Sequence, residues 1–295
     1  MLHLSYEEPL FRPPSEARSL IFQITLGCSR NRCTFCGMYK GKPFRIKPVE
    51  EVCREIESVP SRYRAFVTRV FLADGDAIAY PAEGLAQILD RLASVFPGLT
   101  RVGSYASPAS LAGKTFEQLV TLREKKLRIL YFGLESGDDT TLKEIDKGFI
   151  GDEMAVEALK ARQAGMKLSV TAILGLAGRE RSLVHARETA LWVNRVNPEF
   201  FSLLTLFYRH NDDFIRTLDQ CNRGEIIREA REIVATLNPA KTILRSNHVS
   251  NFLTLEGSYP KDRQRLIDDV DAALARAMKI PGYCESVPEY AESVY

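Results

Sequence analysis

Short apolar runs alternate with helical patterns along the first two thirds of the chain, and this alternation limits the folds that the sequence can adopt. Near-continuous apolar runs are typical of parallel strands that helices cover on both faces. The expected strands are 20–26, 69–73, 101–105, 128–134, 167–174 and 200–206. Right-handed crossovers wind such repeats into a barrel or an open doubly wound sheet. No glycine-rich dinucleotide fingerprint follows the first run, which favours the barrel.

Helical patterns fill the gaps between these runs and change character after the last one. The expected helices are 48–59, 82–95, 114–126, 139–145, 152–164 and 182–196. A mostly helical stretch, a loop with room for a short strand and an amphipathic helix follow at 211–238, 242–255 and 260–278. We therefore predict the α/β class, as an incomplete (β/α)6 barrel of the TIM type with a helical C-terminal extension. The predicted parts are an N-terminal arm, the barrel, and an extension that is a candidate substrate cover, at 1–18, 19–208 and 209–295.

Composition and charge narrow the range of partners and compartments. The net charge of +2 gives no broad field for a phosphate backbone, so nucleic-acid binding is not indicated. The N-terminus lacks a basic start with an apolar run, and no apolar stretch reaches membrane-spanning length. We therefore expect a cytoplasmic protein. In a reducing compartment, clustered thiols indicate metal or redox chemistry rather than structural disulfides.

Three of the six cysteines fall within nine residues, on the loop that follows the first expected strand. Their spacing is Cys28-x4-Cys33-x2-Cys36. In βα barrels, active sites are built at this end of the strands. A Cys-x2-Cys pair brings two thiolates to one metal centre, and a third cysteine upstream closes over it. Three ligands are one fewer than in a closed zinc site or a fully ligated iron–sulfur cluster, so one position stays open.

These cysteines, with Phe35 before the last one, resemble the motif of the radical S-adenosylmethionine (radical SAM) superfamily. Members most often have Cys-x3-Cys-x2-Cys, and the first gap here is one residue longer. The resemblance implies a 4Fe-4S cluster on Cys28, Cys33 and Cys36, with one iron open to the amino and carboxylate groups of S-adenosylmethionine. It also implies an oxygen-sensitive enzyme in which one-electron reduction yields a 5′-deoxyadenosyl radical that abstracts hydrogen from a substrate. Reduced flavodoxin or ferredoxin is the implied electron donor.

Three further stretches extend the resemblance through the expected barrel. "FLADGDAIAYP" ends the second strand, "YFGLESGDDTTLKEIDKG" the fourth and "VTAILGLAG" the fifth. The fourth-strand segment is similar to that of oxygen-independent coproporphyrinogen oxidases and methylthiotransferases. The resemblance covers roughly 20–206 and fades afterwards. The residues that it implies for cofactor binding are Phe35, Gly75, Asp76, Glu135, Ser136 and Gly175.

Each of these patterns has a plainer interpretation. The cysteines also suit a zinc scaffold completed by a distant histidine or cysteine, or a non-enzymatic iron–sulfur electron carrier. Asp76 suits a solvated turn, and Ser136 suits a helix N-cap. The pattern names neither a catalytic residue nor a substrate. A polar segment, 244–260, suits a substrate-facing loop and a self-stabilised surface loop equally, and it includes Arg245, Asn247 and His248.

Overall fold

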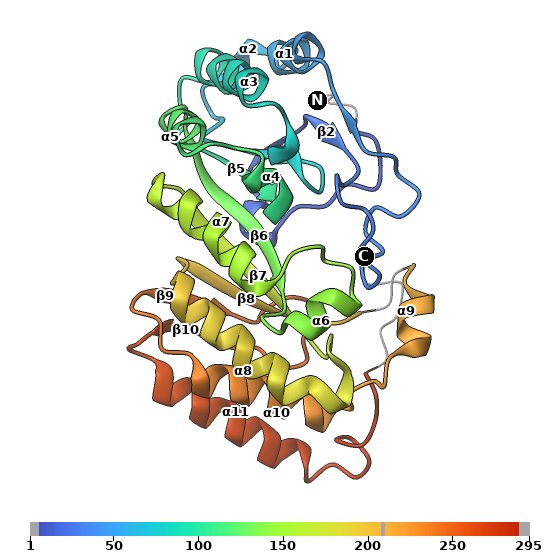
Figure 1. Cartoon of the computed structure of the whole chain (residues 1–295). Coiled ribbons are helices and arrows are strands. Elements are labelled where there is room, and N and C mark those ends of the chain that lie inside the picture. Colours follow the sequence, from blue (N-terminus) through green and yellow to red (C-terminus); the bar gives the residue numbers. More distant parts are fainter. Residues whose placement is uncertain (1–5, 208–209, 289–295) are drawn as a thin grey trace. The chain divides into compact units, whose positions relative to one another are not determined.

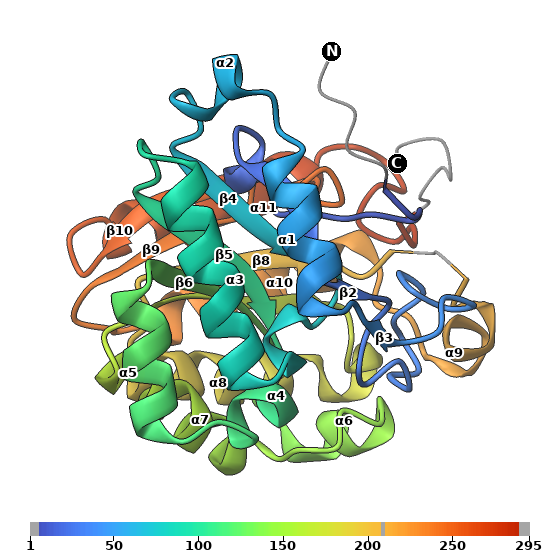
Figure 2. The same ribbon diagram turned by 90° about the horizontal axis from the view of Figure 1, so that it is seen from above.

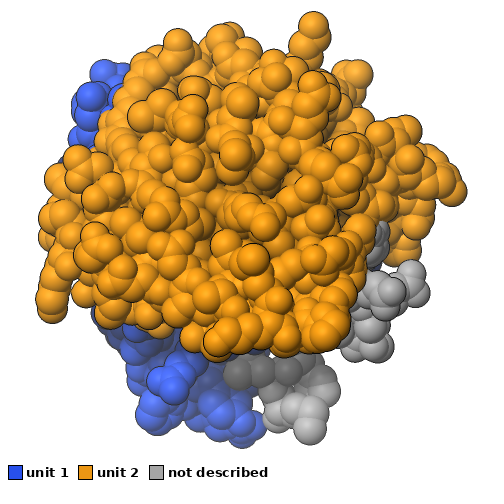
Figure 3. All heavy atoms as spheres, turned by 90° about the horizontal axis from the view of Figure 1, so that it is seen from below, with its two compact units in different colours: residues 1–31, 39–132, 157–168 blue, residues 32–38, 133–156, 169–295 orange. Residues whose placement is uncertain are grey.

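The computed structural model describes residues 6–207 and 210–288, which divide into two compact units (Figure 3). The described residues of unit 1 are 6–31, 39–132 and 157–168. Those of unit 2 are 32–38, 133–156, 169–207 and 210–288. The chain passes between the units several times, so each unit contains segments from distant parts of the sequence.

Unit 1 is built on parallel strands in the order β1, β4, β5 and β6. Their bounds are Leu20–Gln23, Arg69–Ala73, Arg101–Ala106 and Leu127–Glu135, and the last three residues of β6 belong to unit 2. Helices α1, α3 and α5 lie side by side along these strands (Figure 2). The unit 1 helices α1 to α5 are Val49–Glu57, Ser61–Arg64, Ala82–Val95, Pro108–Ala112 and Phe116–Glu124, with 3-10 turns η1 and η2 at Pro14–Glu16 and Ala77–Ala79.

Unit 2 continues with β7, β8 and β9, which pair in parallel, and β10, which pairs antiparallel with β9. These strands are Lys167–Leu174, Phe200–Thr205, Thr242–Arg245 and Glu256–Tyr259, and β7 begins in unit 1. Helix α10 packs between α8 and α11 in one layer (Figure 1). The helices α6 to α11 are Asp139–Glu144, Gly151–Gln163, Gly178–Val196, Asp212–Thr217, Arg223–Thr236 and Arg263–Ala277, and α7 ends in unit 1.

Local sequence sets where several helices begin. Ser107, Thr115 and Asn222 each accept a hydrogen bond from the backbone three residues on, in reciprocal capping boxes that start α4, α5 and α10. Asp138 caps α6 in the same way through its carboxylate. These caps satisfy N–H groups that otherwise lack a partner in the first helical turn.

The predicted α/β class is confirmed, and all six expected strands are present with small shifts. The first one is shorter than expected, because the chain bends at Ile24 and its last two residues form a separate strand, β2 (Thr25–Leu26). Strands β9 and β10 extend the sheet beyond the six that were expected. The boundaries of the predicted arm, barrel and extension remain predictions. No helix in the described residues has both the length and the apolar character that crossing a membrane requires.

Candidate functional site

A short antiparallel pair closes the loop that carries the clustered cysteines. Strand β2 pairs with β3 (Arg45–Ile46), so the loop 27–44 leaves and returns through one neck. Gly27 stands at this neck with φ +70°, and a Cβ there would lie 2.7 Å from the carbonyl oxygen of Lys42. The two ends of the loop therefore approach closely only because residue 27 is a glycine.

In unit 1, Gly75 lies against Cys28. The Gly75 N–H donates to the carbonyl of Gly27 at 3.0 Å. A Cβ on Gly75 would lie 2.7 Å from a ring carbon of Tyr39 and 3.0 Å from the Cβ of Cys28. The turn after β4 thus meets the cysteine loop at a point where only glycine fits.

Asp76, the neighbour of Gly75, is fully buried and forms hydrogen bonds with two serines. It accepts hydrogen bonds from the Ser29 hydroxyl, and from the N–H and hydroxyl of Ser107 at 3.0 and 2.6 Å. Ser29 follows Cys28 directly, and Ser107 follows β5. The contacts of Asp76 therefore position the start of the cysteine loop, and its cofactor-binding role stays a prediction.

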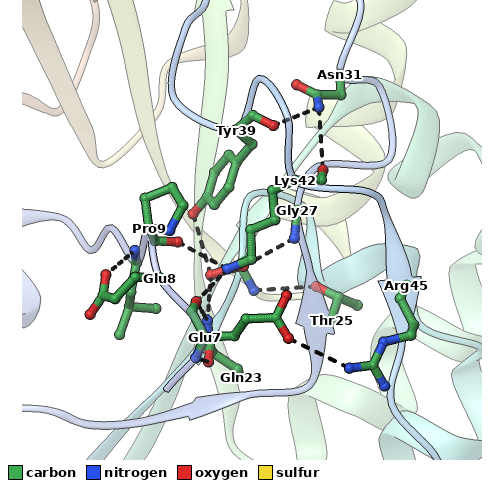
Figure 4. A network of polar contacts seen from close by, with 12 residues as sticks. Glu7, Glu8, Pro9, Gln23, Thr25, Gly27, Asn31, Tyr39, Lys42 and Arg45 are labelled. Carbon is green, nitrogen blue, oxygen red and sulfur yellow. Dashed lines mark hydrogen bonds and ion pairs between the residues drawn. The ribbon is translucent and has the colours of Figure 1, made fainter.

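Asp74 and Lys42 form a buried ion pair that the sequence did not indicate. The Asp74 carboxylate lies 2.6 Å from Lys42 Nζ, and the two side chains are 0% and 4% exposed. The carboxylate also accepts from the N–H of Gly27 at 3.0 Å. The Lys42 ammonium donates further to the carbonyls of Glu7 and Pro9 (Figure 4). This pair connects the N-terminal segment, the end of the cysteine loop and the exit of β4.

In unit 2, Cys33 and Cys36 form a tight turn, with the Cys36 N–H donating to the Cys33 carbonyl at 3.2 Å. Both thiols are partly accessible, and neither is part of a disulfide. Burial raises the pKa of the Cys36 thiol to about 11, Cys33 and Glu135 act in the same direction, and Lys147 acts against them. A thiolate at this position therefore needs a cationic partner, which a bound metal supplies.

Glu135 and Lys147 form an ion pair beside this turn. Glu135 ends β6 with φ +65°, and its Oε1 accepts from Lys147 Nζ at 3.0 Å, with side chains 14% and 10% exposed. The carboxylate folds over Gly133, where a Cβ would lie 2.2 Å from Oε1. The Thr34 N–H donates to the Ile145 carbonyl at 3.0 Å, which ties the cysteine turn to the segment before Lys147. Lys147 was not predicted, although it stands in the quoted fourth-strand segment.

The other predicted cofactor residues are held by contacts within unit 2. Phe35 is buried, and its carbonyl accepts from Asn211 Nδ2 at 2.7 Å. The Ser136 hydroxyl is buried and lies 2.7 Å from His185 Nδ1. The N–H of Gly175, a residue with φ +79°, donates to a carboxylate at 2.8 Å. Their roles in cofactor binding stay predictions.

The segment 244–260 is held down by its own polar side chains. The Ser250 hydroxyl accepts from the N–H of Thr205 at 3.1 Å and lies 2.9 Å from His248 Nδ1. Asn251 Nδ2 donates to the carbonyl of Leu203 at 2.7 Å. These contacts favour the self-stabilised loop, and the substrate-facing role of Arg245, Asn247 and His248 remains a prediction.

The donor chemistry of the cysteines fits an iron–sulfur cluster. Thiolates are the usual protein ligands of such clusters, and none of the clustered cysteines is part of a disulfide. Cys28 belongs to unit 1, and Cys33 and Cys36 belong to unit 2. In the described ranges, no group of three or more His, Cys, Asp and Glu side chains is arranged to hold a metal ion as it stands.

The fold and the cysteine loop together define a class of α/β enzyme cores. Over residues 22–189, more than half of its length, the chain matches the radical SAM superfamily, and it belongs to that superfamily. It is 22% identical over 187 residues to the heme chaperone HemW of Bacillus subtilis, a match that covers 60% of this chain and 49% of the relative. The chain thus spans about half the length of this curated relative.

Solved structures confirm the incomplete barrel. Coproporphyrinogen III oxidase (HemN) from Escherichia coli superposes with a TM-score of 0.54 at 13% identity, over 87% of this chain and 69% of the other. Methylornithine synthase (PylB) gives 0.53 at 16% identity, over 92% and 83%. The methyltransferase TsrM from Kitasatospora setae, with cobalamin and a [4Fe-4S] cluster bound, gives 0.52 at 17% identity, over 63% and 36%. At these identities the likeness concerns the fold alone.

Membership of the superfamily confirms several expectations. The chain is a radical SAM enzyme, and the cofactors of this superfamily are a 4Fe-4S cluster and S-adenosylmethionine. The expected similarity to the core of oxygen-independent coproporphyrinogen oxidases is also confirmed. The alternatives of a non-enzymatic electron carrier and a zinc scaffold are therefore set aside.

Proposed function

We propose that Cys28, Cys33 and Cys36 hold the 4Fe-4S cluster, and that the chain cleaves S-adenosylmethionine reductively to start hydrogen abstraction from a substrate. When bound, the cluster and S-adenosylmethionine together supply the 5′-deoxyadenosyl radical that removes the hydrogen atom. The residues of the chain bind the two groups, orient them and keep water away. The reaction needs a reductant, for which reduced flavodoxin or ferredoxin is our proposal. We also propose a cytoplasmic location, in keeping with six cysteines that form no disulfide.

One observation carries this proposal: each unit, taken alone, places implied cofactor residues beside a cysteine. In unit 1, Gly75 lies against Cys28. In unit 2, Glu135 and Lys147 are close enough to Cys36 to influence its pKa. A carboxylate next to an ammonium matches the ammonium and carboxylate groups at the methionine end of S-adenosylmethionine. Gly75 would offer backbone to the same ligand, because it has no side chain to keep the ligand away.

The test is anaerobic purification followed by iron and sulfide analysis and an ultraviolet–visible spectrum. We expect a brown protein with about four irons per chain that forms 5′-deoxyadenosine from S-adenosylmethionine and dithionite. Replacing Cys28, Cys33 or Cys36 with Ala should remove both properties, because two cysteines do not hold four irons stably. Cys53→Ala, on α1, is the matched control and should keep both. Stoichiometric zinc without a charge-transfer band, or full iron in Cys28→Ala, would contradict the proposal.

A second set of variants separates S-adenosylmethionine binding from cluster assembly. Glu135→Ala should keep normal iron but weaken S-adenosylmethionine binding by about 1.5–3 kcal/mol, because a charged hydrogen bond is lost. Glu144→Ala removes an exposed carboxylate from the nearby α6 and should bind like the wild type. Calorimetry on reconstituted protein measures both. Unchanged affinity in Glu135→Ala would mean that Glu135 does not bind S-adenosylmethionine. The assignment of the three cysteines as cluster ligands would still hold.

A further inference from the structure

Helix α10 of the C-terminal extension carries a carboxylate into the interior of unit 2. Glu229 is 0% exposed, and its Oε1 accepts from the N–H of Gly175 at 2.8 Å. Its Oε2 accepts from the hydroxyl of Ser182 on α8. Gly175 directly follows β7, so a side chain of the extension holds the backbone at the exit of that strand.

His185 on α8 lies near Glu229 and contacts the neighbouring strand exit. Its Nε2 lies 3.5 Å from Glu229 Oε1, and its Nδ1 lies 2.7 Å from the hydroxyl of Ser136. The imidazole is completely buried. Ser136 follows β6, and its hydroxyl also accepts from the N–H of Asp138 at 2.9 Å. A hydrogen bond therefore joins α10 to the exit of β7, whereas His185 Nε2 lies near Glu229 without a hydrogen bond to it.

The burial of Glu229 and His185 is unfavourable in free energy. In the described part of the chain, no lysine or arginine forms an ion pair with Glu229, and burial raises the pKa of its carboxyl to about 7. Burial also lowers the pKa of His185 to about 4. Apolar residues of similar volume often stabilise such a site better, so a buried carboxylate without a cation indicates a role other than stability.

The turn that Glu229 holds depends on defined backbone geometry. Gly175 and Gly178 both have positive φ, at +79° and +67°, and the Gly178 N–H donates to the Gly175 carbonyl at 3.3 Å. Glycine loses more conformational freedom on ordering than any other residue. A hydrogen bond that fixes Gly175 beforehand therefore reduces the ordering that a ligand at this turn would have to cause.

We propose that Glu229 is a positioning residue for S-adenosylmethionine. It fixes the Gly175 backbone directly, so the extension takes part in cofactor recognition without touching the cofactor. This inference rests on the proposed function, because Gly175 is an implied cofactor residue. It assigns to the extension a role in binding S-adenosylmethionine, besides the predicted role as a substrate cover.

The test compares three variants on one helix. Glu229→Ala removes the acceptor, Glu229→Gln keeps an oxygen for the Gly175 N–H, and Glu232→Ala removes an exposed carboxylate paired with Arg187. We expect Glu229→Ala to weaken S-adenosylmethionine binding about tenfold by calorimetry, with normal iron, a raised KM and an unchanged kcat. Glu229→Gln should recover affinity to within about threefold of the wild type, and Glu232→Ala should match the wild type.

Hydrogen exchange of the β7 exit gives a readout that needs no cofactor. Peptides covering Gly175 should lose protection in Glu229→Ala, while Glu229→Gln and Glu232→Ala keep it. Should Glu229→Ala fail to fold, Glu229→Asp withdraws the carboxylate by one methylene and should show the same losses. Wild-type affinity and protection in the Ala or Asp variant, in a wild type that binds S-adenosylmethionine, would overturn the inference. Failure of the wild type to bind a cluster or to cleave S-adenosylmethionine would instead overturn the proposed function.

Discussion

Two carboxylates, one in each unit, are fully buried near a strand exit and are held in opposite ways. Asp74 in unit 1 lies 2.6 Å from the ammonium of Lys42. Among the described residues, Glu229 in unit 2 accepts from an N–H and a hydroxyl, with the His185 ring nitrogen at 3.5 Å. Unit 1 therefore buries a charge together with its counter-charge, whereas unit 2 buries a carboxyl group that burial pushes toward its neutral form.

The difference has a consequence for how each region tolerates change. Breaking a buried ion pair leaves an uncompensated charge, so the cysteine-loop side of unit 1 is fixed by a contact that is costly to lose. A carboxyl group held by neutral donors is replaced by an amide of the same shape at small cost. In unit 2, hydrogen bonds from neutral groups therefore hold Glu229 at the exit of β7, and a charge on its carboxyl group is not needed there.

The largest effect should come from Lys42→Met, which leaves Asp74 buried without a cation. We expect a loss of about 3–5 kcal/mol in the free energy of unfolding by urea denaturation. Lys40→Met removes an exposed cation two residues away and should change little. Adding Asp74→Asn to Lys42→Met should restore part of the loss. A Lys42→Met protein as stable as the wild type would remove the distinction between the two regions.

A smaller, pH-dependent effect should come from Glu229→Gln. Because the folded-state pKa of about 7 lies above the ordinary 4.5, folding favours the protonated carboxyl group. That stability is complete below pH 4.5 and is lost as the pH rises through 7. The variant lacks this loss, so it should exceed the wild type by about 1–3 kcal/mol at alkaline pH and converge with it in acid. Denaturation across this pH range measures the gap, and a constant difference at all pH values would contradict the prediction.

The smallest effect should come from a surface ion pair of unit 2. Arg187 lies 3.1 Å from Glu232, with side chains 60% and 25% exposed. Arg187→Ala should change the free energy of unfolding by less than about 1 kcal/mol, because solvent screens the pair. The same denaturation assay measures it. A loss as large as that of Lys42→Met would mean that burial does not explain the contrast between the two carboxylates.

Features that lie in contiguous sequence were predictable, and features that join distant residues were not. The helix over 82–95 was predicted with the bounds that α3 has, because its apolar face repeats along one short stretch. Helix α4 is an exception, because it was missed although Ser107 and Pro108 form an ordinary helix start in contiguous sequence. Strand β10 was missed because its pairing partner, not its own sequence, makes it a strand.

The same distinction between contiguous and distant residues applies to the candidate site. The cysteines and Glu135 stand in motifs, so the sequence indicated them. Lys42 and Glu229 are far in sequence from the residues that they contact, and only the fold brings them together. His185 stands in none of the motifs, and the structure places it against Ser136 and near Glu229.

The neck formed by β2 and β3 has a consequence for the entropy of cluster assembly. Closing a loop of the length of 27–44 costs roughly 3 kcal/mol of chain entropy, and backbone pairing at the neck already meets this cost. Iron binding therefore costs less conformational entropy than it would if the two ends of the loop were not paired. Closure entropy grows only with the logarithm of loop length, so one added residue costs less than about 0.1 kcal/mol. The extra residue between Cys28 and Cys33 is then a thermodynamically silent insertion, absorbed by a loop whose ends are already joined.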